Sequence, residues 1–135
     1  MKKIIIALDG PAGSGKTTTA REVAKKLNYI YIDTGAMYRA TTLAFIRSGK
    51  ELEGFDFDSL MDNIKIELEP SESGQRTLLN GEDVSKEIRT AEVTKLASPV
   101  AAVGIVREKL VDQQRELGKQ GGVVMDGRDI GTVVF

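Results

Sequence analysis

The sequence contains neither cysteine nor histidine. Without cysteine there can be no disulfides or thiolate metal sites, and without histidine there can be no imidazole ligands and no catalytic triad with a histidine base. Long tracts of glycine, proline or serine are also absent, and hydrophobic residues make up 41% of the 135 residues. This composition is typical of a globular chain with one main core.

A strong charge of either sign is missing as well, because 19 basic residues face 20 acidic ones and the net charge is −1. This balance gives no broad footprint for a nucleic acid polymer or an anionic membrane, so any phosphate recognition must be local. Lys2, Lys3 and the apolar run at 4–8 imitate an export signal, but Asp9 and Gly10 interrupt it. No other run approaches the length of a membrane span, and we expect a cytoplasmic protein.

Apolar runs and helical periodicity alternate along the chain and predict an α/β fold. The runs suit strands buried on both faces of a parallel sheet, and the periodic segments suit helices that flank it. We expect strands at 4–8, 29–32 and 123–125, and helices at 16–27, 36–48 and 99–117. Asn28, Gly49 and Gly118 stand where these helices should end.

The segment between about residues 51 and 98 has a different pattern. Ile64, Ile66 and Leu68 alternate with charged residues, as in a half-solvated strand, and a turn follows at 70–74. A second strand at 77–79 runs into Asn80-Gly81, a hairpin signal, and Val84 continues into a third strand. We therefore expect a core of residues 1–50, a small antiparallel β-rich insert at 51–98, and a returning core helix and strand at 99–135.

A phosphate-binding loop follows the first predicted strand. Residues 10–17 match the pattern GxxxxGK[ST] and lie between a strand and a helix, as the mechanism requires. Glycines let the main chain approach phosphates, Lys16 would contact the β and γ phosphates, and Thr17 would bind Mg²⁺. The predicted ATP-binding residues are Gly10, Pro11, Ala12, Gly13, Ser14, Gly15, Lys16, Thr17 and Thr18. This motif alone does not separate a kinase from an ATPase or a GTPase.

Polar residues also follow the second and third predicted strands. Thr34 can cap the next helix and offer its hydroxyl to a phosphate, and Arg39 can present a bidentate fork to an oxyanion. The alternative is an ordinary capped helix with a solvent-facing arginine. After the third strand, Asp126 suits the acidic residue near Mg²⁺ and Arg128 suits a second phosphate clamp. A tight turn would explain Gly127 but not the charges around it.

Four stretches of the sequence together resemble the bacterial-type cytidylate kinases, which are relatives of the adenylate, guanylate and uridylate kinases. The stretches are residues 9–16, 33–39, 82–89 and 126–135. They follow the family's order, and the resemblance runs from Ile5 to Phe135. It implies a P-loop parallel sheet flanked by helices, here incomplete with about three core strands, and it implies that the insert binds the nucleoside monophosphate.

The resemblance also implies roles for individual residues. Thr34, Arg39 and Arg128 would hold the monophosphate, with Tyr38 in the same site, and Ser98, Arg107 and Asp129 would read the cytosine. A carboxylate accepts from the cytosine N4 amino group, whereas uracil presents an acceptor there. Without the resemblance, Ser98 would be read as a helix-boundary residue and Arg107 as a solvated helix arginine.

The implied reaction moves the γ-phosphoryl group of ATP, bound with Mg²⁺, to CMP or dCMP and yields ADP and CDP or dCDP. Lys16, Arg39 and Arg128 would stabilise the transferred charge, while Thr17 and, through water, Asp126 would hold the metal. The alternatives are a P-loop kinase for another nucleoside monophosphate and a nucleotide-binding module that does not catalyse.

Cytidylate kinases are longer than this chain and continue into further parallel strands and a lid that carries arginines. The family enzymes are monomers in which the P-loop strand is central. Without the further strands, the strand at 4–8 would have no neighbour on one side and would form an apolar sheet edge. We expect a truncated form with little turnover, since one arginine in such sites is worth about 10³ or more in rate. We also expect the edge to favour self-association.

Overall fold

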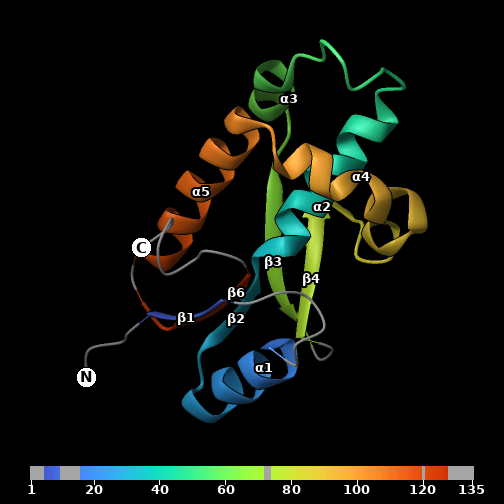
Figure 1. The fold of residues 1–135 in the computed structure, drawn as a ribbon. Coiled ribbons are helices and arrows are strands. Elements are labelled where there is room, and N and C mark those ends of the chain that lie inside the picture. The colour runs from blue at the N-terminus through green and yellow to red at the C-terminus, as the bar shows by residue number, and fades with distance from the viewer. Residues whose placement is uncertain (1–4, 10–15, 72–73, 120, 128–135) are drawn as a thin grey trace. The chain divides into compact units, whose positions relative to one another are not determined.

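The computed structural model describes residues 5–9, 16–71, 74–119 and 121–127. It has an α/β fold with two separate three-stranded sheets (Figure 1). The chain divides into two compact units, one of residues 1–35, 70–75 and 111–135 and one of residues 36–69 and 76–110. The predicted fold class, a helix-flanked parallel sheet with a small antiparallel sheet beside it in sequence, is confirmed.

The parallel sheet consists of β1 (Ile5–Asp9), β6 (Val123–Gly127) and β2 (Ile30–Asp33), in that order. The central strand is β6, the last strand of the described residues, which runs parallel to both neighbours and is buried along its whole length. Three predicted core strands are thus confirmed. In the described part of the chain β1 lies at one edge of the sheet, and its association with a second copy stays a prediction.

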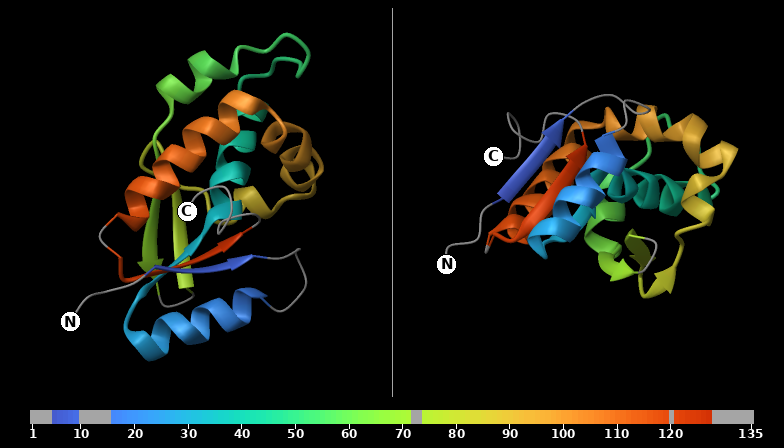
Figure 2. Two further views of the ribbon diagram at one scale, coloured as in Figure 1. Left: turned by 60° about the vertical axis from the view of Figure 1, so that its left-hand side comes forward. Right: turned by 90° about the horizontal axis from the view of Figure 1, so that it is seen from below.

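Helix α1 (Lys16–Leu27) lies along one face of this sheet (Figure 2). Ala20 and Ala24 are buried and pack against Tyr31 of β2 and Val124 of β6. Leu27, which the periodicity placed on the core face, is instead 46% exposed, because it is the last helical residue before the chain turns into β2. Asn28 ends the helix with φ of 57°, the left-handed conformation expected there.

Helix α2 (Thr34–Arg47) begins two residues before the predicted start. The Asp33 carboxylate accepts a hydrogen bond from the Gly35 N–H at 3.0 Å and so fills the capping role predicted for Thr34. The prediction that the Thr34 side chain caps the helix was therefore wrong. At the other end Gly49, with φ of 71°, follows the helix as expected.

The second sheet has the order β3 (Ile66–Ser71), β4 (Gly74–Leu79) and β5 (Glu82–Asp83). Asn80 and Gly81 join β4 to β5 with φ of 51° and 85°, and both values are positive, as a two-residue type I′ loop requires. The predicted hairpin is confirmed. Val84 follows β5 rather than lying in it, but it is fully buried and its N–H donates to the Thr77 carbonyl at 2.9 Å.

Two short helical elements interrupt the insert, which sequence patterns had suggested to be β-rich. They are α3 (Phe57–Asn63) and the 3₁₀ helix η1 (Glu87–Arg89). The Asp56 carboxylate caps α3 by accepting from the Ser59 N–H at 3.0 Å. The strand expected from Ile64 consequently starts at Ile66, because Ile64 is the C-cap of α3.

Helices α4 (Ala91–Ala101) and α5 (Gly104–Gly118) replace the single helix predicted from Pro99 to Leu117, which was wrong. The Thr90 hydroxyl accepts from the Val93 N–H at 3.4 Å and starts α4. Pro99 has no N–H to donate to the preceding turn, and α4 ends two residues after it.

The buried face of α5 also differs from the expected one. Val106 and Leu110 are buried as predicted, but the face continues through Gln114, which is 2% exposed, and Leu117 is 37% exposed. Among the described residues, the Gln114 Nε2 atom is buried without a hydrogen-bond partner. The buried face that was predicted to end with the apolar Leu117 thus includes the polar Gln114 instead.

The core of the second unit is formed by residues of α2, the insert and the first part of α5. Met37, Val84, Ile88, Val93 and Val106 are among its almost fully buried members. Three phenylalanines at positions 45, 55 and 57 pack with ring centroids 4.7, 4.8 and 5.4 Å apart. Such aromatic pairs add about 0.5–1.5 kcal/mol each beyond their buried area. In the described part of the chain, every helix is too short or too polar to cross a bilayer.

Candidate functional site

The three parallel strands end in line at one edge of their sheet. The register pairs Asp9 with Gly127, and Asp126 with both Leu8 and Asp33. The segments that follow these ends in sequence are the phosphate-binding loop, the start of α2 and residues 128–135. Open α/β sheets bind ligands outside the carboxyl ends of their strands. The parallel register therefore brings the described ends of the three strands, Asp9, Gly127 and Asp33, to a common edge.

Asp126 is the most buried polar residue at this edge, with 1% of its surface exposed. Its Oδ2 atom accepts from the Tyr31 hydroxyl at 3.0 Å, and its main-chain carbonyl accepts from the Thr34 hydroxyl at 2.9 Å. The guanidinium of Arg21 lies 5.6 Å from the centre of the Tyr31 ring. The Asp126 carboxylate is therefore held by Tyr31 of the neighbouring strand β2, and the Thr34 hydroxyl donates to the main chain of β6.

The end of β2 is held by a side chain of the insert hairpin. Gln75 accepts from the Asp33 N–H at 2.8 Å and donates to the Asp33 carbonyl at 3.4 Å. An amide side chain thus makes the two bonds that a further strand would make. A Cβ added at Gly35 would lie 3.2 Å from the Asp33 carboxylate, so the glycine gives this carboxylate its room.

Arg39 lies in the second turn of α2, in the other unit of the chain. Its Nη1 donates to the Ile88 carbonyl at 3.1 Å and to the Thr94 hydroxyl at 2.9 Å. The side chain is half-buried rather than solvent-facing. Tyr38, the other residue of α2 expected in the site, is partly buried against the core of that unit.

Ser98 and Arg107, the expected readers of cytosine, are both exposed, on α4 and in the first turn of α5. Arg128 and Asp129 lie outside the described residues, as do Gly10, Pro11, Ala12, Gly13, Ser14 and Gly15. Of Lys16 and Thr17 only the place at the start of α1 is described, and Thr18 is exposed. The roles predicted for these residues stay predictions.

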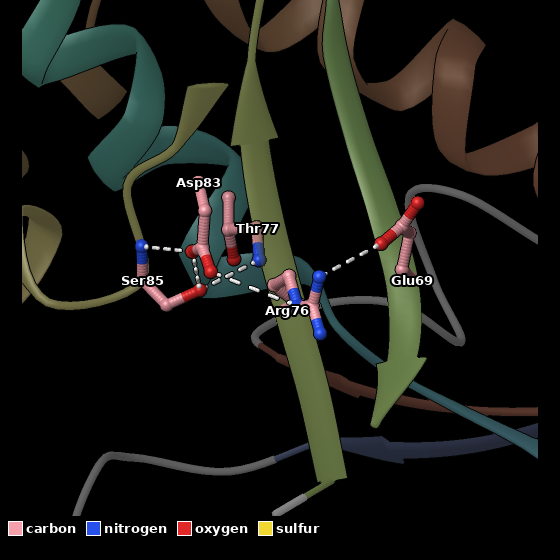
Figure 3. Close-up of polar contacts among 5 residues, drawn as sticks. All are labelled: Glu69, Arg76, Thr77, Asp83 and Ser85. Atoms are coloured by element: carbon pink, nitrogen blue, oxygen red, sulfur yellow. Dashed lines mark hydrogen bonds and ion pairs between the residues drawn. The ribbon is translucent and has the colours of Figure 1, made fainter. Parts of the chain in front are cut away.

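The insert sheet carries a cluster of charges of its own (Figure 3). Arg76 of β4 lies 3.7 Å from the Glu69 carboxylate and 3.6 Å from that of Asp83. The Ser85 hydroxyl donates to Asp83 at 2.6 Å and accepts from the Thr77 N–H at 2.9 Å. Donation by Ser85, with a smaller attraction from Arg76, lowers the pKa of Asp83.

A second charged pair joins the insert to α2. Arg47 donates to both carboxylate oxygens of Glu82, at 2.9 and 3.0 Å. These bonds lower the pKa of Glu82 and raise that of Arg47. Both side chains are exposed, so the pair contributes little at neutral pH beyond fixing α2 to the hairpin.

No three acidic side chains of the described residues come together as a metal cluster. A Mg²⁺ site of the nucleotide-dependent kind needs only one or two protein oxygens, because substrate phosphates and water supply the rest. A single buried, hydrogen-bonded carboxylate at the strand ends fits that donor set. Asp126 is thus chemically suited to the metal role predicted for it.

Sequence reasoning missed Tyr31, Gln75 and Thr94. Tyr31 counted only as a β-former, although a tyrosine in a buried strand needs a partner for its hydroxyl, and that need was an available signal. Gln75 stood beside a predicted turn and Thr94 in a helix that was not predicted. Their partners are 42 and 55 residues away, so no local pattern marks them.

An α/β sheet with its polar strand ends aligned defines the class of a ligand-binding α/β protein, and comparison with known proteins gives the particular family. Residues 6–135 match the family model described as cytidylate kinase. The chain therefore belongs to the cytidylate kinase family.

Curated relatives named cytidylate kinase support this membership. The protein of Chloroherpeton thalassium is 54% identical over 134 residues, covering 99% of this chain and 57% of the relative. That of Exiguobacterium sibiricum is 56% identical over 136 positions, covering 100% and 61%, and that of Bacillus cereus strain AH187 is 53% identical over 135 residues, covering 99% and 60%. The chain thus spans about three fifths of the length of these relatives.

Proposed function

We propose that this chain carries the nucleotide-binding part of an enzyme that transfers the γ-phosphoryl group of ATP to CMP or dCMP. Family membership over residues 6–135 is the observation that carries the proposal. The common edge formed by the ends of β1, β6 and β2 supports it, because donor and acceptor phosphates must approach one another. The proposed substrates imply a cytoplasmic enzyme of pyrimidine metabolism.

The residues of the chain would act by positioning and by charge. Residues 10–18 would hold ATP, with Lys16 at the β and γ phosphates, while Arg39 and Arg128 would hold the phosphate of CMP. That phosphate is already largely ionised at neutral pH, since a phosphate monoester has a second pKa of about 6, and no general base is needed. The absence of histidine is consistent with this chemistry.

The metal would be held by the Thr17 hydroxyl and, through water, by Asp126. Bound Mg²⁺ supplies charge neutralisation between the β and γ phosphates. The chain's own contribution is to keep the Asp126 carboxylate buried and oriented by the Tyr31 hydroxyl.

Calorimetric titration of CMP and UMP into the chain and into an Asp129→Ala variant tests the proposed specificity. Asp58→Ala, at an exposed aspartate of α3, serves as the matched control. We expect CMP to bind tighter than UMP, and the preference to fall by about tenfold or more in Asp129→Ala only. Equal affinity of the unchanged chain for both nucleotides would refute the cytosine assignment.

Titration of ATP with Mg²⁺ and an assay of CDP formation separate the remaining readings. Absence of ATP binding would contradict the kinase assignment. ATP and CMP binding without any CDP would identify the chain by itself as a nucleotide-binding module. CDP formation at a high rate would show instead that these residues suffice for the reaction.

A further inference from the structure

We infer that Thr94 and the Ile88 carbonyl form a positioning device that orients the Arg39 guanidinium for the acceptor phosphate. The inference rests on the proposed function of the chain. Its basis is a set of contacts within one unit. Arg39 extends from α2, Ile88 belongs to η1 and Thr94 lies in the first turn of α4.

The two contacts use a single nitrogen of the guanidinium. Nη1 carries two hydrogens, and it donates to the Ile88 carbonyl at 3.1 Å and to the Thr94 hydroxyl at 2.9 Å. Both donors of Nη1 are therefore used. The remaining three N–H groups belong to Nε and Nη2, which together form the edge that binds two oxygens of one anion.

Fixing Nη1 therefore selects the edge that can grip a phosphate. A guanidinium held this way loses less rotational freedom when the ligand binds, and this lowers the cost of forming the bidentate pair. Thr94 is suited to the task because its hydroxyl accepts from the cation without adding a competing charge. An aspartate there would hold Arg39 more strongly but would also neutralise it.

The supporting elements are built to keep the two acceptors in place. Ile88 is 1% exposed, and its N–H donates to the Val84 carbonyl at 3.0 Å, so its peptide is anchored in the core. Thr94 is set by the start of α4, where its N–H donates to the Thr90 carbonyl at 3.0 Å. This gives the stretch 82–89, which was marked only by resemblance, a definite role at the site.

The device is tested by calorimetry with CMP and with cytidine, because the ratio of the two affinities reports the contribution of the phosphate. In Thr94→Val we expect CMP binding to weaken about fivefold to tenfold while cytidine binding changes less than about twofold. Thr94→Ser, which keeps the hydroxyl, should restore the ratio. In an Arg39→Ala background, Thr94→Val should cause no further loss, since both changes then act on one interaction.

Asp56→Ala is the structural control, because it removes the cap of α3 and leaves Arg39, η1 and α4 unchanged. It should lower the melting temperature and leave the CMP-to-cytidine ratio unchanged. An equal loss of the ratio in Asp56→Ala and Thr94→Val, or an unchanged ratio in Thr94→Val, would overturn the inference alone. If the unchanged chain binds CMP no better than cytidine, the proposed function fails and the inference with it.

Discussion

Removing one hydroxyl at position 31 should measurably destabilise the chain. The Tyr31 hydroxyl donates to the Asp126 carboxylate at 3.0 Å, and both residues are buried, with 7% and 1% of their surfaces exposed. A hydrogen bond to a charged group contributes about 1.5–3 kcal/mol. Tyr31→Phe keeps the ring, its packing against α1 and its contact with Arg21. We therefore expect a loss of about 1.5–3 kcal/mol.

The assay is urea unfolding followed by far-ultraviolet circular dichroism, which does not depend on the altered tyrosine. A double-mutant cycle with Asp126→Asn isolates the pair, and we expect a coupling energy of about 1 kcal/mol or more. Arg21→Gln, which removes only the cation over the ring, should cost less than about 1 kcal/mol. A loss below about 0.5 kcal/mol in Tyr31→Phe, with no coupling to Asp126, would refute the reasoning.

Three further changes test other parts of the fold. Gly81→Ala should lower the free energy of unfolding in urea by about 1–2 kcal/mol, because φ is 85° there although nothing lies within 4 Å of an added Cβ. Gly104→Ala, at an equally open position, should be neutral or stabilising. The pKa of Glu82 is lowered from its ordinary value of 4.5, so its stabilisation is present above that pH and is lost as the pH falls through the lowered pKa. Glu82→Gln should flatten this acid-induced loss of stability, whereas the exposed Glu53→Gln should keep it. Gln114→Met should raise the unfolding free energy by about 1 kcal/mol, because it replaces a buried amide whose Nε2 atom has no partner among the described residues; a fall of that size would indicate that the amide is satisfied in solution.

The sequence was most informative where the determinant is local. Buried parallel strands appear as short β-branched runs, and left-handed positions appear as Asn28, Gly49 and the Asn80-Gly81 pair. These are constraints on single residues or neighbours, so they can be read without knowing the tertiary structure. The order β1-β6-β2 could not be read in this way. The paired residues are 118 positions apart for β1 and β6 and 93 for β2 and β6, and strands pair through the same main-chain groups whatever their side chains.

Prediction failed where distant residues replace a local preference. At the start of α2, Thr34 and Asp33 are both good capping residues. The choice between them depends on the Asp126 carbonyl, which accepts a hydrogen bond from the Thr34 hydroxyl. In the second half of the chain, the apolar positions from Val103 to Leu117 suggested a single helix that starts at Pro99. The caps at Thr90 and the break before Gly104 were weaker signals than the periodicity and were missed.

Side chains and main chain make different contacts in the stretch 82–89. Two of its charged side chains act within the insert and its link to α2, since Glu82 pairs with Arg47 and Asp83 with Ser85 and Arg76. The group that accepts from Arg39 is a main-chain carbonyl, that of Ile88, which any residue could supply if its peptide were held in the same place. Side-chain changes at Glu82 and Asp83 should therefore alter stability without altering phosphate binding, whereas changes that shift η1 should alter both. A motif match thus identifies the segment, but only the contacts show that one of its main-chain carbonyls, that of Ile88, accepts from Arg39.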